Sequence, residues 1–253
     1  MNPSQENDVI REKLAKAFRA LAWYGFQEGV ANHVSAIAPA KSGNGEVILF
    51  IPDGVLWQDA TPDILLGVDS KSGKLVEGNN TTVNDISMAV HMPIYERRPD
   101  VKAVIHSHAK YATTLSCLED PTLLNIHQNS TYFHNAIAYD TQYDGISTSE
   151  NEEGKRLAQS LGEKDVLLMG NHGLLVAAPS VAITFYMMFY MERACETQIT
   201  AMSTGRPLRI IPNEVAAKTR DFFIETAQAD AEKHLDAAAR LADGHYKQNE
   251  QCL

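Results

Sequence analysis

Apolar residues recur along this chain with two periods, one typical of helices and one typical of strands. In residues 8–24 they fall at helical spacing, as Ile10 and Leu14 illustrate, and Gly25 follows as a helix stop signal. The segment GEVILFIP at 45–52 has β-branched and aromatic residues between Gly and Pro, which predicts a strand. The same criteria predict helices at residues 84–99, 109–118, 150–162 and 180–204, strands at 29–39 and 101–109, and hairpin-like elements at 71–80 and 165–179.

The predicted elements follow one another without an internal repeat, a low-complexity tract or a linker. We therefore expect a single domain over residues 1–253, with a core at about 8–212 and an Ala-rich, helical C-terminal extension. A chain of 253 residues is long enough to bury the core of one large α/β domain.

The composition limits the kinds of partner. Hydrophobic residues make up 44% of the chain and charged residues 21%, as in soluble globular proteins. The formal net charge of -10 argues against nucleic acid as a partner, because phosphate backbones attract basic surfaces. An anionic small molecule stays possible, since one bound metal ion outweighs the average surface charge locally.

The cysteines and the apolar segments indicate a compartment. Cys117, Cys195 and Cys252 lack the regular spacing of a disulfide framework, so reduced thiols are expected. The polar N-terminus MNPSQENDVIREK has no apolar segment of a secretory signal. The apolar run AITFYMMFYM has about half the length that a transmembrane helix needs. We expect a cytoplasmic protein that does not bind membranes.

Three of the nine histidines have a context that suggests metal binding. His106 and His108 end an apolar strand, and side chains two residues apart lie on the same face of a strand, with Ser107 pointing away. His172 lies in a Gly-Asn-His-Gly turn between two apolar runs. Three imidazoles with an open position form a common catalytic zinc site, and Mn, Fe, Co and Ni also accept imidazole. On spacing alone, packing or hydrogen bonding explains a His-x-His pair equally well.

Five segments, in this order, resemble the class II aldolase/adducin family across residues 25–212. They are GVANHVSAI, YERRPDVKAVIHSHAKYATTLS, FHNAIAYDTQYDG, LLMGNHGLLV and FYMMFYMERACETQ. The resemblance implies an α/β fold with three layers, α/β/α, around a central, mainly antiparallel sheet. It also implies a homotetramer with active sites between subunits, and zinc or a related divalent ion on the matched residues His106, His108 and His172.

The chain departs from the sugar-phosphate aldolases of this family at the positions that bind phosphate and move protons. Val30 stands where those aldolases have a phosphate-binding Thr, and His33 stands where they have an Asn. Ser87 occupies the position of their acid/base Glu, with Asp85 nearby. Val30 cannot donate a hydrogen bond, so a phosphorylated substrate is not expected. The segment Asn-His-x-Ser is similar to that of the adducin-like branch, which includes metal-dependent decarboxylases and noncatalytic proteins.

The resemblance also suggests residues that contact the substrate. A tyrosine from a neighbouring subunit lies near the metal in the aldolases, and Tyr139 is its best match, with Tyr143 as the second choice. His33 is a candidate for substrate contact or catalysis, although a hydrogen bond that fixes the turn is an equal alternative. Asn84, Ser87 and Gln128 are further candidates for substrate binding.

These observations favour an enzyme over a scaffold. The leading hypothesis is a metal-dependent lyase that cleaves a carbon–carbon bond in a small hydroxy or oxo acid, by decarboxylation or retro-aldol cleavage. Its substrate would be a carboxylate or carbonyl compound without phosphate. One alternative is Fe(II)-dependent oxygen chemistry at the same three histidines. The other is a noncatalytic, adducin-like interaction module, which a fourth protein ligand from Asp85 or His33 would favour.

Overall fold

The computed structural model describes residues 1–253 except 79–80, 144, 146–151 and 251–253, together with the backbone but not the side chains of 245–250. Cys252 and parts of the predicted hairpin at 71–80 and helix at 150–162 therefore lie outside the described residues.

The first helix, α1 (Pro3–Trp23), begins earlier than the apolar pattern predicts. Asn2 caps it, because its side chain accepts the backbone N–H of Gln5 while the Gln5 side chain accepts that of Asn2. This first turn is polar and has no apolar stripe, so the periodicity of apolar residues does not predict it. The helix ends before Gly25, whose φ of 73° is in the left-handed region.

Among the described residues, eight strands form one sheet in the order β4-β3-β2-β1-β5-β8-β7-β6. Every neighbouring pair is antiparallel except β6 and β7, which confirms the expected, mainly antiparallel sheet. The strands are β1 (His33–Pro39), β2 (Glu46–Phe50), β3 (Leu66–Asp69), β4 (Leu75–Glu77), β5 (Ala103–Ser107), β6 (Ile137–Asp140), β7 (Val166–Met169) and β8 (Gly173–Ala178).

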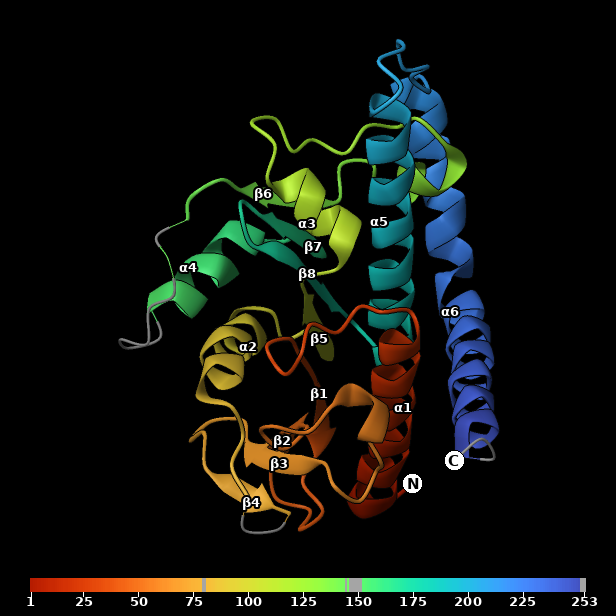
Figure 1. The fold of residues 1–253 in the computed structure, drawn as a ribbon. Helices are drawn as coiled ribbons and strands as arrows, with labels where there is room; N and C mark the ends of the chain where they lie inside the picture. The colour runs from red at the N-terminus through yellow and green to blue at the C-terminus, as the bar shows by residue number, and fades with distance from the viewer. Residues whose placement is uncertain (79–80, 144, 146–151, 251–253) are drawn as a thin grey trace.

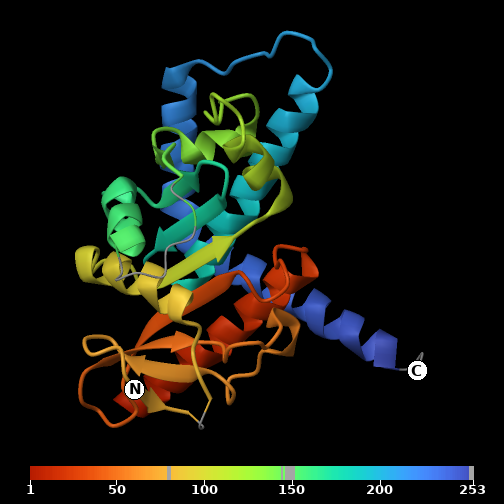
Figure 2. The same cartoon turned by 60° about the vertical axis from the view of Figure 1, so that its left-hand side comes forward.

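Helices cover both faces of this sheet, as the three-layer expectation requires. On one side α2 and α4 lie side by side, and on the other α5 packs between the sheet and α6, with α1 and α3 in the same layer (Figures 1 and 2). The helices are α2 (Asp85–Arg97), α3 (Lys110–Ser116), α4 (Glu152–Leu161), α5 (Val181–Met202) and α6 (Asn213–Glu250), with 3-10 turns η1 (Trp57–Asp59) and η2 (Gln128–Phe133).

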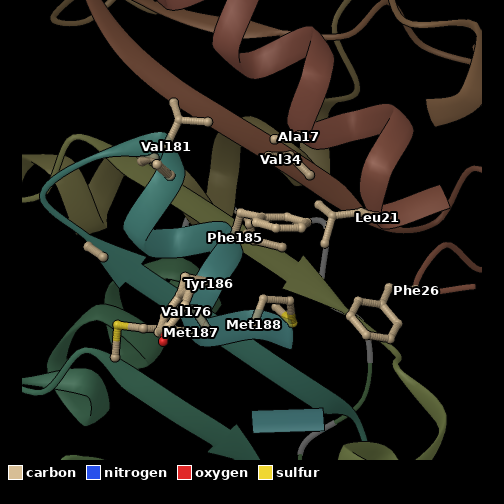
Figure 3. Close-up of a cluster of buried hydrophobic side chains, with 14 of the residues drawn as sticks. Ala17, Leu21, Phe26, Val34, Val176, Val181, Phe185, Tyr186, Met187 and Met188 are labelled. Atoms are coloured by element: carbon tan, nitrogen blue, oxygen red, sulfur yellow. The ribbon is translucent and has the colours of Figure 1, made fainter. Parts of the chain in front are cut away.

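Two apolar cores result, one on each face of the sheet. In the larger one, Phe185 of α5 lies next to Leu21 of α1, and Val34 and Val176 of the sheet belong to the same cluster (Figure 3). The apolar run predicted to be a core helix is the largely buried N-terminal half of α5. In the described part of the chain, no helix is long and apolar enough to cross a membrane.

The sheet brings two of the predicted site residues together. Strand β1 pairs with β5 so that His33 lies directly opposite His106. The β7–β8 hairpin is the neighbour of β5, and its turn holds His172. Helix α2 packs over β1 and carries Ser87 near its start. The candidate site therefore lies where β1, β5 and the β7–β8 turn meet.

Candidate metal centre

The three predicted ligands converge in the structure. His106 is in β5, His108 follows that strand, and His172 lies in the β7–β8 turn. One ligand atom from each side chain lies within 4.8 Å of the others. The ring centroid of His172 is 4.8 Å from that of His106 and 5.0 Å from that of His108. The predicted same-face orientation also holds, because Ser107 turns away and donates to the carbonyl of Phe26.

The geometry of the turn explains its glycine. Asn171 has a φ of 56°, a left-handed conformation that Asn tolerates. A Cβ atom added at Gly173 would lie 2.8 Å from the carbonyl oxygen of Ser107 and 3.0 Å from Cδ2 of His108. The absence of a side chain at 173 thus lets the turn approach β5 closely enough for His172 to reach the other two imidazoles.

The neighbours of His106 and His108 fix where their ring protons sit. His106 Nδ1 lies 3.1 Å from the carbonyl oxygen of Leu174, and His108 Nδ1 lies 2.5 Å from a carboxylate oxygen of Glu28. Both oxygens are acceptors, so each Nδ1 carries a hydrogen and donates. In the neutral rings, both Nε2 atoms are then left with lone pairs, as in histidines that bind metals.

These two lone pairs face each other, since the Nε2 atoms of His106 and His108 are only 3.1 Å apart. Such an approach is repulsive unless a cation lies between them. A proton can join two nitrogens, but His172 turns toward the same place, and only a metal ion can join three. Two ligands at about 2.1 Å from a tetrahedral ion lie about 3.4 Å apart, close to the observed separation. The triad therefore fits a divalent metal ion.

Burial favours the neutral, metal-binding forms of His106 and His172. It lowers the pKa of His106 well below its ordinary value and also lowers that of His172, and the neighbouring histidines act in the same direction. Within the described residues, the group of potential ligands contains these three histidines and neither His33 nor Asp85. A metal held here would keep coordination positions open, which is typical of catalytic rather than structural sites.

His33 lies beside the triad, and its ring centroid is 4.8 Å from that of His106. Its Nδ1 is 2.8 Å from Nε2 of His91, a buried residue of α2. Burial lowers the pKa of His33 well below its ordinary value. His33 also lines a small cavity with Asn84 and Ser87, so three of the residues predicted to bind substrate surround one space.

Asn84 has a structural role in addition to this position. It caps α2, because its side-chain oxygen accepts the backbone N–H groups of Ile86 and Ser87. Its side-chain nitrogen donates to Asp53 at 3.2 Å. Ser87 stands on the first turn of α2, where a longer side chain would extend toward the cavity.

Of the remaining predicted residues, Tyr139 and Gln128 contact other parts of the subunit, whereas Tyr143 lies beside His172. The hydroxyl of Tyr139, on the edge strand β6, accepts the backbone N–H of Leu123 at 3.0 Å. The ring of Tyr143 is nearer, with its centroid 6.3 Å from that of His172. Gln128 begins η2, which packs against α5 and α6. Whether Tyr139 or Gln128 reaches the site of a neighbouring subunit stays a prediction.

The structure adds two residues that the sequence interpretation missed, Glu28 and His91. Glu28 forms a hydrogen bond with His108, and His91 forms one with His33. A signal for His91 was present, because His91 and Tyr95 are four residues apart on a predicted helix and therefore share a face. Glu28 lies in a turn before β1, and no periodic pattern marks it.

Comparisons with known proteins place the chain in a family. Residues 12–199 match the family described as Class II Aldolase and Adducin N-terminal domain. A protein of Pseudomonas aeruginosa named for the class 2 aldolases is 34% identical over 213 residues, which cover 84% of this chain and 79% of that protein. Decarboxylase NovR of Streptomyces niveus is 28% identical over 217 residues, or 85% of this chain and 78% of its own.

Similarity extends to an adducin and to solved structures. Alpha-adducin of Rattus norvegicus is 30% identical over 219 residues, which are 84% of this chain but 29% of that protein. The crystal structure of an aldolase II superfamily protein from Pseudomonas syringae superposes with a TM-score of 0.84 at 30% identity, covering 95% of this chain and 94% of that one. The family match, the sheet and the histidine triad agree, and the chain belongs to the class II aldolase and adducin family.

Proposed function

We propose that this protein is a metal-dependent lyase that cleaves a carbon–carbon bond in a small hydroxy or oxo acid without phosphate. The observation that supports this most is the convergence of three imidazoles, with the Nε2 atoms of His106 and His108 3.1 Å apart and ligand atoms of all three histidines within 4.8 Å of one another. When bound, a divalent ion supplies positive charge that stabilises an enolate-like oxygen as the bond breaks. Zinc is the first candidate, and Mn, Fe, Co and Ni suit the same ligands.

The small cavity lined by His33 supports a substrate without phosphate. His33, Asn84 and Ser87 offer polar groups to it, and Val30 lies at its wall. Its described lining includes no Lys or Arg, so it lacks the cations that commonly bind phosphate. Ser87 in place of a carboxylate removes the acid/base group of the sugar-phosphate aldolases, which favours decarboxylation over retro-aldol cleavage. The relative named as a decarboxylase supports the same choice.

The proton that quenches the carbanion is proposed to come from Tyr139 of a neighbouring subunit. Burial raises the pKa of Tyr139, which keeps its hydroxyl protonated. This residue stands on β6, at an edge of the sheet, and is partly exposed, which leaves room for contact with another subunit. The proposal therefore includes a homotetramer with shared active sites, in the cytoplasm. Tyr143, near His172 in the same subunit, is the second candidate.

The adducin relatives support one competing function, a noncatalytic interaction module. In that case the triad would bind no metal, or would bind it without turnover. Metal analysis separates the lyase from a module that binds no metal, and a screen for activity separates it from a module that binds metal without turnover. The protein is purified without added metal, and its metal content is measured for the parent and for His106→Ala. We expect stoichiometric divalent metal in the parent and its loss in the variant, because the two remaining histidines bind a metal ion more weakly than three.

The matched control is His134→Ala, which removes an imidazole whose two nitrogens contact Asn125 and Asn135 instead of the triad. It should keep its metal. A parent protein free of metal would overturn the lyase and favour the interaction module, whereas stoichiometric iron would favour oxygen chemistry. With metal present, a screen of small carboxylic acids for released CO2 or for a carbonyl fragment then identifies the reaction.

A further inference from the structure

A chain of hydrogen bonds leads from the cavity into the buried space between β1 and α2. His33 Nδ1 is 2.8 Å from His91 Nε2, His91 Nδ1 is 2.6 Å from Ser35 Oγ, and Ser35 Oγ is 2.8 Å from the hydroxyl of Tyr95. His91 and Ser35 are completely buried. Each link holds one hydrogen, so the direction of donation at one end determines the direction at the other.

The Tyr95 end sets this direction. Among the described residues, the hydroxyl of Tyr95 has one acceptor within hydrogen-bond distance, Ser35 Oγ. If Ser35 donated to Tyr95, a buried O–H would have no acceptor, which native proteins avoid. Tyr95 therefore donates to Ser35.

The remaining steps follow from this one. The hydroxyl of Ser35 uses its hydrogen on His91 Nδ1, so the proton of His91 is on Nε2. Burial lowers the pKa of His91 to about 3, and the ring therefore holds a single proton at neutral pH. His91 Nε2–H donates to His33 Nδ1. The proton of His33 is then on Nε2, the ring nitrogen that has no protein partner among the described residues.

We infer that His33 is a fixed hydrogen-bond donor to the substrate, and that His91, Ser35 and Tyr95 are positioning residues that impose its tautomer. The Nε2–H group suits an oxygen of a small carboxylate, or the oxygen on which negative charge develops during bond cleavage. With its proton on Nε2, His33 is neither a fourth metal ligand nor a proton acceptor. The choice of substrate oxygen rests on the proposed function, but the tautomer does not.

His106 and His108 have the opposite tautomer to His33 in the same site. His106 and His108 donate from Nδ1 to an oxygen and keep a lone pair on Nε2, whereas His33 accepts at Nδ1 and keeps a hydrogen on Nε2. Neighbouring imidazoles are thereby divided into metal ligands and a substrate donor by what holds their other nitrogen.

Nuclear magnetic resonance tests the tautomer directly. Protein with 15N-labelled histidine, in metal-free and zinc-loaded forms, is analysed by long-range 1H–15N correlation, and the signals of His33 are assigned by their loss in His33→Gln. We expect a protonated Nε2 and an unprotonated Nδ1 in both forms. A protonated Nδ1 would overturn the inference.

Two variants test the positioning residues. Ser35→Ala removes the donor to His91 Nδ1, so a second tautomer of His33 should appear while zinc content is unchanged. Thr184→Val is the control, because it removes another buried hydroxyl, on α5, that bonds only to backbone carbonyls. It should leave the His33 signals as they are. An unchanged His33 spectrum in Ser35→Ala would contradict the proposed chain.

Binding of oxalate, a small dicarboxylate that resembles an enolate, tests the donor role. In zinc-loaded protein, His33→Phe should weaken oxalate binding roughly ten- to a hundredfold, as expected for a lost hydrogen bond to a charged group. Equal affinity would overturn the substrate contact. If the parent binds no zinc, the proposed function fails, and the spectra of the metal-free protein still decide the tautomer of His33.

Discussion

Glu28 and the carbonyl of Leu174 set the chemistry of two ligands without touching the metal position. Each accepts a hydrogen bond from Nδ1 of one histidine, which aims the lone pair of Nε2 into the site. A carboxylate in this position also makes the imidazole a stronger ligand, because it stabilises positive charge on the ring. Glu28 is largely exposed, with 67% of its side chain accessible, so it contributes little to packing.

This exposure makes Glu28 a clean test of metal affinity. Glu28→Gln keeps an oxygen that can accept from His108 but removes the charge. We expect zinc affinity, measured by competition with a chelating dye, to fall roughly tenfold, and Glu28→Ala to lower it up to about a hundredfold. Glu163→Gln removes an equal charge from an exposed position outside the site and should change nothing. Equal affinity in the parent and Glu28→Ala would show that His108 needs no partner.

At the scale of elements, the site depends on how closely α2 and α4 pack. A Cβ atom added at Gly154 of α4 would lie 1.8 Å from the carbonyl oxygen of Ala89 in α2. No side chain fits in that space, and backbone cannot move aside as a flexible side chain does. Gly154 therefore sets the distance between the two helices, and α2 carries His91 and Tyr95 toward β1.

Gly154→Ala should consequently destabilise the protein, by roughly 1–3 kcal/mol if the helices can separate slightly. Urea unfolding monitored by circular dichroism measures this free energy. Gly244→Ala is the control, because Gly244 lies in α6 with no atom near an added Cβ. That change should be neutral or stabilise by up to about 1 kcal/mol. Equal stabilities of the two variants would mean that the close approach is not required.

Periodicity predicted the elements better than their ends. The strand pattern of β5, the hairpin around Asn171 and the core helix α5 are confirmed, because each has an apolar pattern that burial enforces. The start of α1 was missed because its cap is polar. The site also divides into a predictable and an unpredictable part. The same-face arrangement of His106 and His108 follows from strand geometry. The approach of His172 depends on the order of strands, which no local pattern contains.

For the whole molecule, the buried histidines predict how stability depends on pH. Burial lowers the pKa of His91 from 6.5 to about 3, and it also lowers the pKa of His234. The unfolded chain then binds more protons than the folded one below pH 6.5. The contribution of these histidines to the free energy of unfolding is therefore complete above that pH and decreases as the pH falls. Between pH 6.5 and pH 5, His91 alone accounts for about 2 kcal/mol, at 1.4 kcal/mol per pH unit.

His234 allows this dependence to be tested away from the metal. Its ring lies among aromatic side chains, with centroids 4.6 Å from Phe189 and 5.2 Å from Phe185, so His234→Phe should pack there. Urea unfolding of metal-free protein at pH 7, 6 and 5 should show a smaller loss of stability in the variant. Asp165 and Glu192, whose pKa values burial raises, oppose the trend in both proteins, so the difference isolates the histidine. Parallel curves would mean that His234 becomes protonated in the folded protein as readily as in the unfolded chain.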